Sequence, residues 1–229
     1  MHAFADLTRT LEGLEAPDAA GAVSGDVAWQ AERDAVLHRH LQAVPPADAA
    51  WAVGLLAGRA PRPPLTQARL RQLGPALSGL DDWLFEACCQ ATGDVAEAIA
   101  QALPAAAPGP APALSQLMAD ELPRLGGQPA DVQRERLQPL LARLDPGGRF
   151  VLLKLVAGGW RSPVSALTLQ RSLAALAGVA PARMALRLAA WTPAASTDAT
   201  RWQELMVSAS ADDARLAPAQ PKPFTPLQL

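Results

Sequence analysis

The sequence contains no tyrosine, only four phenylalanines and only two cysteines. Aromatic and β-branched residues favour strands, so their scarcity beside abundant Ala and Leu favours helices. The two cysteines, Cys88 and Cys89, are adjacent, and neighbouring side chains on a helix point too far apart for a disulfide of normal geometry. We therefore predict an all-α protein without a disulfide framework.

Histidine and long apolar runs are equally scarce. The three histidines are remote from the cysteine pair and show no zinc-ligand spacing. No stretch reaches the roughly 18 apolar residues of a membrane span, and the N-terminus lacks the pattern of a signal peptide. We expect a cytoplasmic monomer that has no metal, no cofactor of its own and no membrane partner.

Apolar residues recur at helical spacing in segments that end at Gly or Pro, which predicts a compact domain of about twelve helices. The clearest segments are Val27–Val44, Pro46–Leu56, Thr66–Leu77, Asp82–Ala91, Val95–Leu103, Leu114–Leu125, Ala130–Leu144, Arg149–Ala157, Pro163–Ala177, Pro181–Trp191 and Ala199–Ser208. The Pro-, Ala- and Gly-rich stretch Pro104–Pro112 is a surface connector and a candidate boundary between two helical halves.

Acidic residues are absent from two long segments, 49–80 and 146–197. These segments contain half of the 20 basic residues, namely Arg59, Arg62, Arg69, Arg71, Arg149, Lys154, Arg161, Arg171, Arg183 and Arg187, and none of the 22 acidic ones. The net charge of −2 therefore hides a segregation that lets two basic segments form one face for a polyanion. The alternative is that Arg is simply the common surface cation of a high-GC composition.

The sharpest local feature is a turn between two helices. The first, Arg149–Ala157, is apolar on nearly all faces, and Gly158-Gly159 ends it by permitting a left-handed cap. We predict that Ser162 caps the next helix, with Pro163 at its first position. Free amides at that helix start, the Ser162 hydroxyl and Arg161 would then converge on a phosphate, although such a cap is more often only structural.

Three blocks of sequence resemble the DNA-binding domain of bacterial ATP-dependent DNA ligases. They are RFVLLKLVAGGWRSPVSALTLQRSLAALAG at 149–178, DDWLFEACCQATGDVAEAIAQALP at 81–104, and the helix at 51–56 followed by the basic turn GRAPR. The blocks keep the family's order and are spread over residues 51–178 of the chain. The resemblance implies an all-helical domain, here 1–216, that holds duplex or nicked DNA by its backbone during repair, replication or recombination, close to the nucleoid.

The turn, the acid-free segments and the resemblance together predict which residues contact DNA. These are Arg161, Ser162, Gly159, Trp160, Ser165, Lys154, Arg171, Arg59 and Arg62. Pro163 stands where relatives tend to have Gly, which removes one amide and shifts phosphate contacts toward Ser165. Arg59 and Arg62 are equally compatible with plain solvation, and Trp160 is more often a helix anchor than a sugar contact.

The second block also has a structural interpretation. Asp94 and Glu97 fit a capping box, with Asp94 accepting from the amide three residues on and Glu97 reaching back. Trp83, Leu84 and Phe85 lie in an acidic helix that a phosphate backbone would repel, so we predict that they anchor the core.

The chain lacks the Lys-x-Asp-Gly motif whose lysine attacks ATP in ligases. Lys154 is followed by Leu-Val-Ala and Lys222 by Pro-Phe-Thr. The Pro-rich stretch 217–229 resembles the linker toward a nucleotidyltransferase domain, to which ATP and Mg²⁺ would belong. By itself the chain is not an enzyme; it is a fragment that acts with the catalytic domains of a parent ligase, or a truncated stand-alone product.

A protein-interaction module is the alternative function, with Trp29, Trp51 and Trp191 as candidate anchors of a partner surface. The two functions predict different distributions of arginines and apolar residues on the surface. Convergence of Arg59, Arg62, Arg161 and Arg171 on one face favours DNA, whereas scattered arginines beside a large apolar patch favour a protein partner.

The missing lysine motif makes one direct prediction. Incubation of the chain with labelled ATP and magnesium should leave it unlabelled, because no lysine is placed to form the phosphoramidate. Electrophoresis followed by autoradiography measures this, and stable AMP transfer to Lys154 or Lys222 would contradict it.

Overall fold

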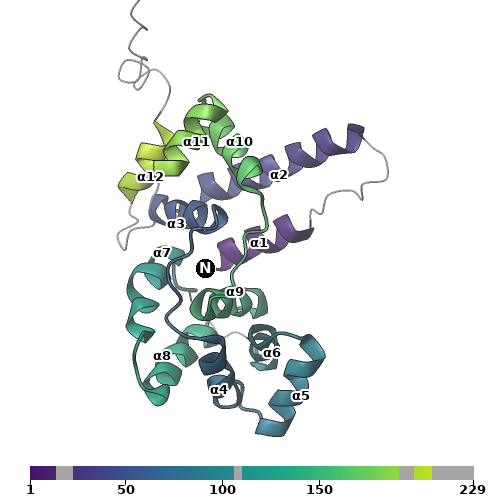
Figure 1. Cartoon of the computed structure of the whole chain (residues 1–229), viewed down its shortest axis with the longest axis vertical. Helices are drawn as coiled ribbons and strands as arrows, with labels where there is room; N and C mark the ends of the chain where they lie inside the picture. The colour runs from purple at the N-terminus through teal and green to yellow at the C-terminus, as the bar shows by residue number, and fades with distance from the viewer. Residues whose placement is uncertain (14–22, 106–109, 191–198, 208–229) are drawn as a thin grey trace, which may run out of the picture.

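The computed structural model describes residues 1–13, 23–105, 110–190 and 199–207, and within them the chain is all-α (Figure 1). Twelve α-helices and no strand are found in these ranges, as the sequence predicts. The helices are α1 (His2–Gly13), α2 (Val23–Ala43), α3 (Pro46–Leu56), α4 (Gln67–Ser78), α5 (Asp82–Thr92), α6 (Val95–Ala102), α7 (Leu114–Gln116), α8 (Ala130–Ala142), α9 (Pro146–Ala157), α10 (Ala166–Ala177), α11 (Pro181–Ala190) and α12 (Ala199–Met206).

Four expected helices differ from the observed ones by three residues or more at one end, or are interrupted. Helix α2 begins at Val23, four residues earlier than expected. The predicted helix Leu114–Leu125 is broken, because a π turn, Leu117–Glu121, and a 3₁₀ turn, Pro123–Leu125, follow α7. Helix α9 begins three residues earlier than expected, since the Asp145 side chain accepts from the Gly148 amide and Pro146 occupies the first position. Helix α10 begins three residues later than expected, and α1 was not predicted at all.

One hydrophobic core joins helices from both ends of the chain. Helix α9 lies near the middle of the molecule, packed against α1 and α6, while α4 packs against α6 and α8 and α3 packs against α7 and α12 (Figure 1). Helices that precede residues 104–112 in the sequence therefore pack directly against helices that follow them. The described helices form one packed body, and the connector does not divide them into two halves.

Arg149, in the first turn of α9, is the largest of the fully buried side chains, with 1% of its surface exposed. Its Nε donates to Leu141 O at 2.9 Å, at the end of α8. Its two terminal nitrogens donate to Leu103 O at 3.0 Å and Pro104 O at 2.6 Å, beyond the end of α6, with a longer bond to Ala100 O. The guanidinium thus donates to carbonyls at the ends of two helices, of which Leu141 O also accepts from the Leu144 amide at 3.2 Å.

The helix hairpin α4–α5 corrects one expectation about the second sequence block. Phe85 is buried, and its ring lies so close to Gly74 of α4 that a Cβ there would be 2.0 Å from Phe85 Cζ. Leu84 is half-buried, but Trp83 is 71% exposed and does not anchor the core. The error arises because α5 buries one face only, and Trp83 lies on the other.

Substitution of Arg149 tests its role in the fold. Arg149→Ala should lower the free energy of unfolding by about 3 kcal/mol, because it removes a buried side chain and its hydrogen bonds to carbonyls at the ends of α6 and α8. Arg149→Lys should recover only part of this, since an ammonium cannot reproduce the planar fork. Arg136→Ala, at an exposed position on α8, is the control and should change stability by less than about 0.5 kcal/mol. Urea denaturation gives these values, and a stable Arg149→Ala protein would contradict the assignment.

Candidate nucleic-acid interface

The connection between α3 and α4 lies directly beside the connection between α9 and α10. The Leu65 amide donates to Val156 O at 3.1 Å, and Gln67 Nε2 donates to Ala157 O at 3.2 Å. At the other end of the contact, Ser162 Oγ donates to Leu56 O at 2.7 Å. The two acid-free segments, about 100 residues apart in sequence, therefore meet along these connections. We call this contact the crossing, meaning residues 55–67 with 156–164.

Gly158, Gly159 and Trp160 build the turn that enters the crossing. Gly158 ends α9 with a φ of 80°, as the Gly-Gly pair predicts. A Cβ at Gly159 would lie 2.8 Å from Lys154 Cδ, so this glycine allows the Lys154 stem to pass close to the main chain. Trp160 donates from Nε1 to Leu55 O at 3.0 Å, and its ring lies 5.5 Å from that of Phe4. Trp160 is therefore a helix anchor, the more common of its two expected roles.

Ser162 is not the cap of the next helix, which corrects the prediction made for it. Its hydroxyl bridges Leu56 O and the main chain of Val164. Ser165 is the N-cap instead, and its Oγ accepts from the Thr168 amide at 3.1 Å. The predicted helix start fails because the turn is held by α3, and Pro163 then extends the chain to Ser165. An anion at the start of α10 would meet exposed Ser165 and the amides after it, away from Ser162.

The structure separates the cations that are engaged in the fold from those that are available to a ligand. Arg149 is buried, and Lys154 forms an ion pair with Asp94 at the start of α6. Burial raises the pKa of the Asp94 carboxyl, but hydrogen bonds from Lys154 and from two amides of α6 outweigh this and hold the pKa below its usual range. Lys154, predicted to contact DNA, is thus already neutralised by a carboxylate.

Asp94 itself behaves partly as predicted. Its carboxylate accepts from the amides of Ala96 and Glu97, which confirms the cap. Glu97 does not reach back, because its carboxylate accepts from Gln101 one turn later.

Arg59, Arg62 and Arg161 remain as the arginines of the crossing. Arg62 and Arg161 are exposed and Arg59 is half-exposed, and none has an ion pair with a described residue. Arg171 is also exposed, but it lies on α10 six residues beyond the cap Ser165 and takes no part in the bonds of the crossing. Of the four arginines whose position was expected to distinguish DNA binding from protein binding, the structure therefore places three on two neighbouring segments.

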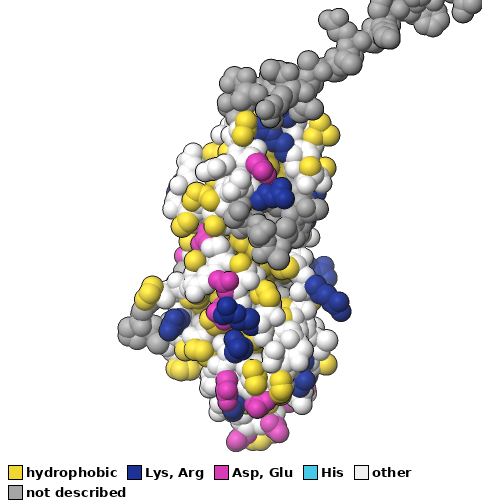
Figure 2. Space-filling model, turned by 90° about the vertical axis from the view of Figure 1, so that its left-hand side faces the viewer, with side chains coloured by type: hydrophobic (Ala, Val, Ile, Leu, Met, Phe, Trp, Pro, Cys, Tyr) yellow, Lys and Arg dark blue, Asp and Glu magenta, His cyan; other side chains and the backbone are white. Residues whose placement is uncertain are grey.

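Charge is mixed on the face shown in Figure 2. Lys and Arg side chains form several separate groups there, and acidic side chains lie among them. On this face, the pattern limits the number of phosphates that cations without acidic neighbours could contact.

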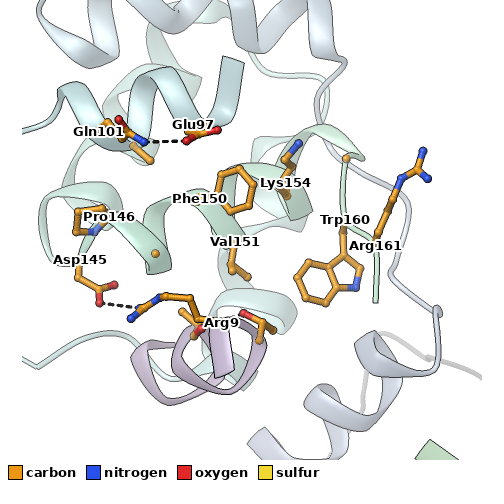
Figure 3. Close-up of a pocket in the computed structure, with 15 residues that line it drawn as sticks. Arg9, Glu97, Gln101, Asp145, Pro146, Phe150, Val151, Lys154, Trp160 and Arg161 are labelled. Carbon is orange, nitrogen blue, oxygen red and sulfur yellow. Dashed lines mark hydrogen bonds and ion pairs between the residues drawn. The ribbon is translucent and has the colours of Figure 1, made fainter. Parts of the chain in front are cut away.

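A groove opens beside the crossing, between α1, α6 and α9 (Figure 3). Trp160 and Arg161 line one end of it, and Phe150, Glu97 and Gln101 line the remainder. Sequence reasoning did not find this groove, because its walls come from three helices that no motif connects. Phe150 lies within the recognised block but carries no signal that distinguishes it from a core residue.

Comparisons with known proteins add no assignment, since no family model and no curated protein matches the chain. In the described ranges, no group of three His, Cys, Asp or Glu side chains is placed to hold a metal ion. No single described helix is long and apolar enough to span a membrane, and α10 and α11 pass that test only jointly, across a bend of 109°.

Two substitutions distinguish the role of the Ser165 hydroxyl, which caps α10, from that of the Ser162 hydroxyl, which bonds to Leu56 O. Ser165→Ala should lower stability by about 1 kcal/mol through the lost cap. Ser162→Ala should lower it by a similar amount because Leu56 O loses its side-chain donor. Amide hydrogen exchange distinguishes the two, since only Ser165→Ala should speed exchange in the first turn of α10. Faster exchange in the first turn of α10 in Ser162→Ala would instead indicate that Ser162 caps this helix.

Proposed function

We propose that this chain binds duplex DNA through its phosphate backbone, without reading the base sequence. The observation that carries the proposal is the crossing, which joins the two acid-free segments and presents Arg59, Arg62 and Arg161 without acidic partners among the described residues. Guanidinium groups form charge-assisted bonds with phosphate oxygens, and such contacts position a protein on DNA without selecting a sequence.

The ligase resemblance extends this proposal to a biological setting. In that setting the chain is the DNA-binding part of an ATP-dependent ligase that acts in repair, replication or recombination. ATP and Mg²⁺ would be used by the catalytic domains, and the present chain would hold the duplex or nicked DNA. The Pro-rich stretch 217–229, proposed as the linker, lies outside the described residues.

The alternative, a protein-interaction module, is favoured by one observation. Trp83 on α5 is 71% exposed, and exposed tryptophans are frequent anchors of protein interfaces. Trp51, an anchor expected from the sequence, is buried in α3, and the side chains of Trp29 and Trp191 lie outside the described residues.

Salt dependence tests the proposal. Three or four phosphate contacts should give a log–log slope of affinity against salt of about −3 to −4 in duplex DNA, because each contact releases condensed counterions. Arg161→Ala should weaken binding about tenfold and reduce the slope by about one. Fluorescence anisotropy with a labelled duplex measures both quantities.

The control is Arg136→Ala, which removes an exposed arginine of α8 outside both acid-free segments. It should leave affinity and slope nearly unchanged. A slope near zero, or strong preference for one base sequence, would contradict backbone binding. Loss of a protein partner in Trp83→Leu, with no DNA binding by the wild type, would favour the alternative.

A further inference from the structure

The groove between α1, α6 and α9 has the size and lining of a small-ligand site. Its volume is about 700 Å³, within the range of pockets that enclose drug-sized ligands. Phe150 and Val151 of α9 and Ala100 of α6 form apolar parts of its wall, and Trp160 closes one end. Figure 3 shows the Phe150 ring in the middle of this space, between α6 and the turn that carries Trp160.

The aromatic side chains of the groove are held in place. Lys154 Nζ lies 5.1 Å from the centre of the Phe150 ring while it is paired with Asp94. Trp160 is fixed by its bond to Leu55 O. A half-exposed phenylalanine ring on a rigid helix offers a flat face on which a planar ring can stack without ordering the protein further.

Charge is distributed unequally along the groove. Arg9 is bonded to Asp145, and Lys154 to Asp94, so these two cations are compensated. Arg161 has no ion pair within the described part of the chain, and the Glu97 carboxylate meets only the neutral amide of Gln101. In Figure 3, Glu97 lies on one side of Phe150, and Arg161 lies on the other side beyond Trp160, with its guanidinium directed outward. The complementary ligand has an anion at one end, a planar ring in the middle and a hydrogen-bond donor at the other end.

We propose that the groove binds an unpaired nucleotide of DNA. The base stacks on Phe150, the adjacent phosphate meets Arg161, and an exocyclic amine donates to Glu97. This proposal rests on the proposed function, because Arg161 belongs both to the crossing and to the groove. Removing a base from a duplex costs unstacking energy, and a base that is already unpaired avoids this cost. The protein therefore prefers duplexes that carry a one-nucleotide flap or a gap over intact duplexes.

The experiment uses a duplex with a one-nucleotide flap of 2-aminopurine and the same sequence with 2-aminopurine paired. Wild-type protein should quench the flap nucleotide by stacking and bind the flap about tenfold more tightly than the intact duplex. Phe150→Leu keeps the apolar character of the side chain but removes the ring. It should therefore abolish quenching, and the protein should bind the flap and the intact duplex about equally. Its affinity for intact duplex should change less than twofold.

Two further variants sharpen the test. Trp83→Leu removes an exposed aromatic ring of α5, outside the groove, and should leave quenching and preference unchanged. An unpaired adenine should be bound about fivefold more tightly than an unpaired thymine, which has no exocyclic amine, and Glu97→Gln should reduce this difference.

The failures of the two proposals are distinguishable. Binding to intact duplex with no flap preference and no quenching would overturn the nucleotide site and leave backbone binding intact. If no duplex is bound, a short single strand containing 2-aminopurine tests the groove alone: quenching that Phe150→Leu abolishes supports the site, and its absence overturns it. Displacement of the strand by an acidic aromatic peptide but not by deoxynucleotides would also overturn it, in favour of a protein ligand.

Discussion

Helix α9 is fixed at both of its ends by hydrogen bonds to other helices and connections, and the candidate interface depends on this constraint. At its start, Arg149 is bound to carbonyls at the ends of α6 and α8. At its end, the carbonyls of Val156 and Ala157 accept from the α3–α4 connection. Because buried carbonyls are costly to leave without donors, these bonds set the position of the following turn, and with it the position of Arg161.

The same bonds decide which cations remain for a ligand. A basic, acid-free segment suggests that all of its cations are available, but the fold uses Arg149 to cap helix ends and Lys154 to pair with Asp94. The arginines of the crossing are left over because other groups make its structural contacts, namely the Leu65 amide and the side chains of Gln67 and Ser162. A moderately basic, locally concentrated surface results, and such a surface suits weak, salt-sensitive binding to a polyanion.

The sequence predicted the fold class and most helices because apolar periodicity and Gly or Pro punctuation are local signals. It also predicted the left-handed cap at Gly158 and the side-chain cap at Asp94. It misplaced the start of α10, because Ser162 and Ser165 are both plausible caps and only the contact with Leu56 O decides between them. The sequence pattern could not predict that Trp83 is exposed and Arg149 is buried, since each depends on which face of its helix a neighbouring helix covers. The groove was missed for the same reason.

Amide hydrogen exchange with and without duplex DNA tests whether the crossing is the DNA-binding surface. We expect protection on binding to be concentrated in residues 57–65 and 158–166, on both sides of the crossing, with no change in α5. Protection confined to α5 around Trp83, or an exchange pattern that DNA leaves unchanged throughout, would contradict it.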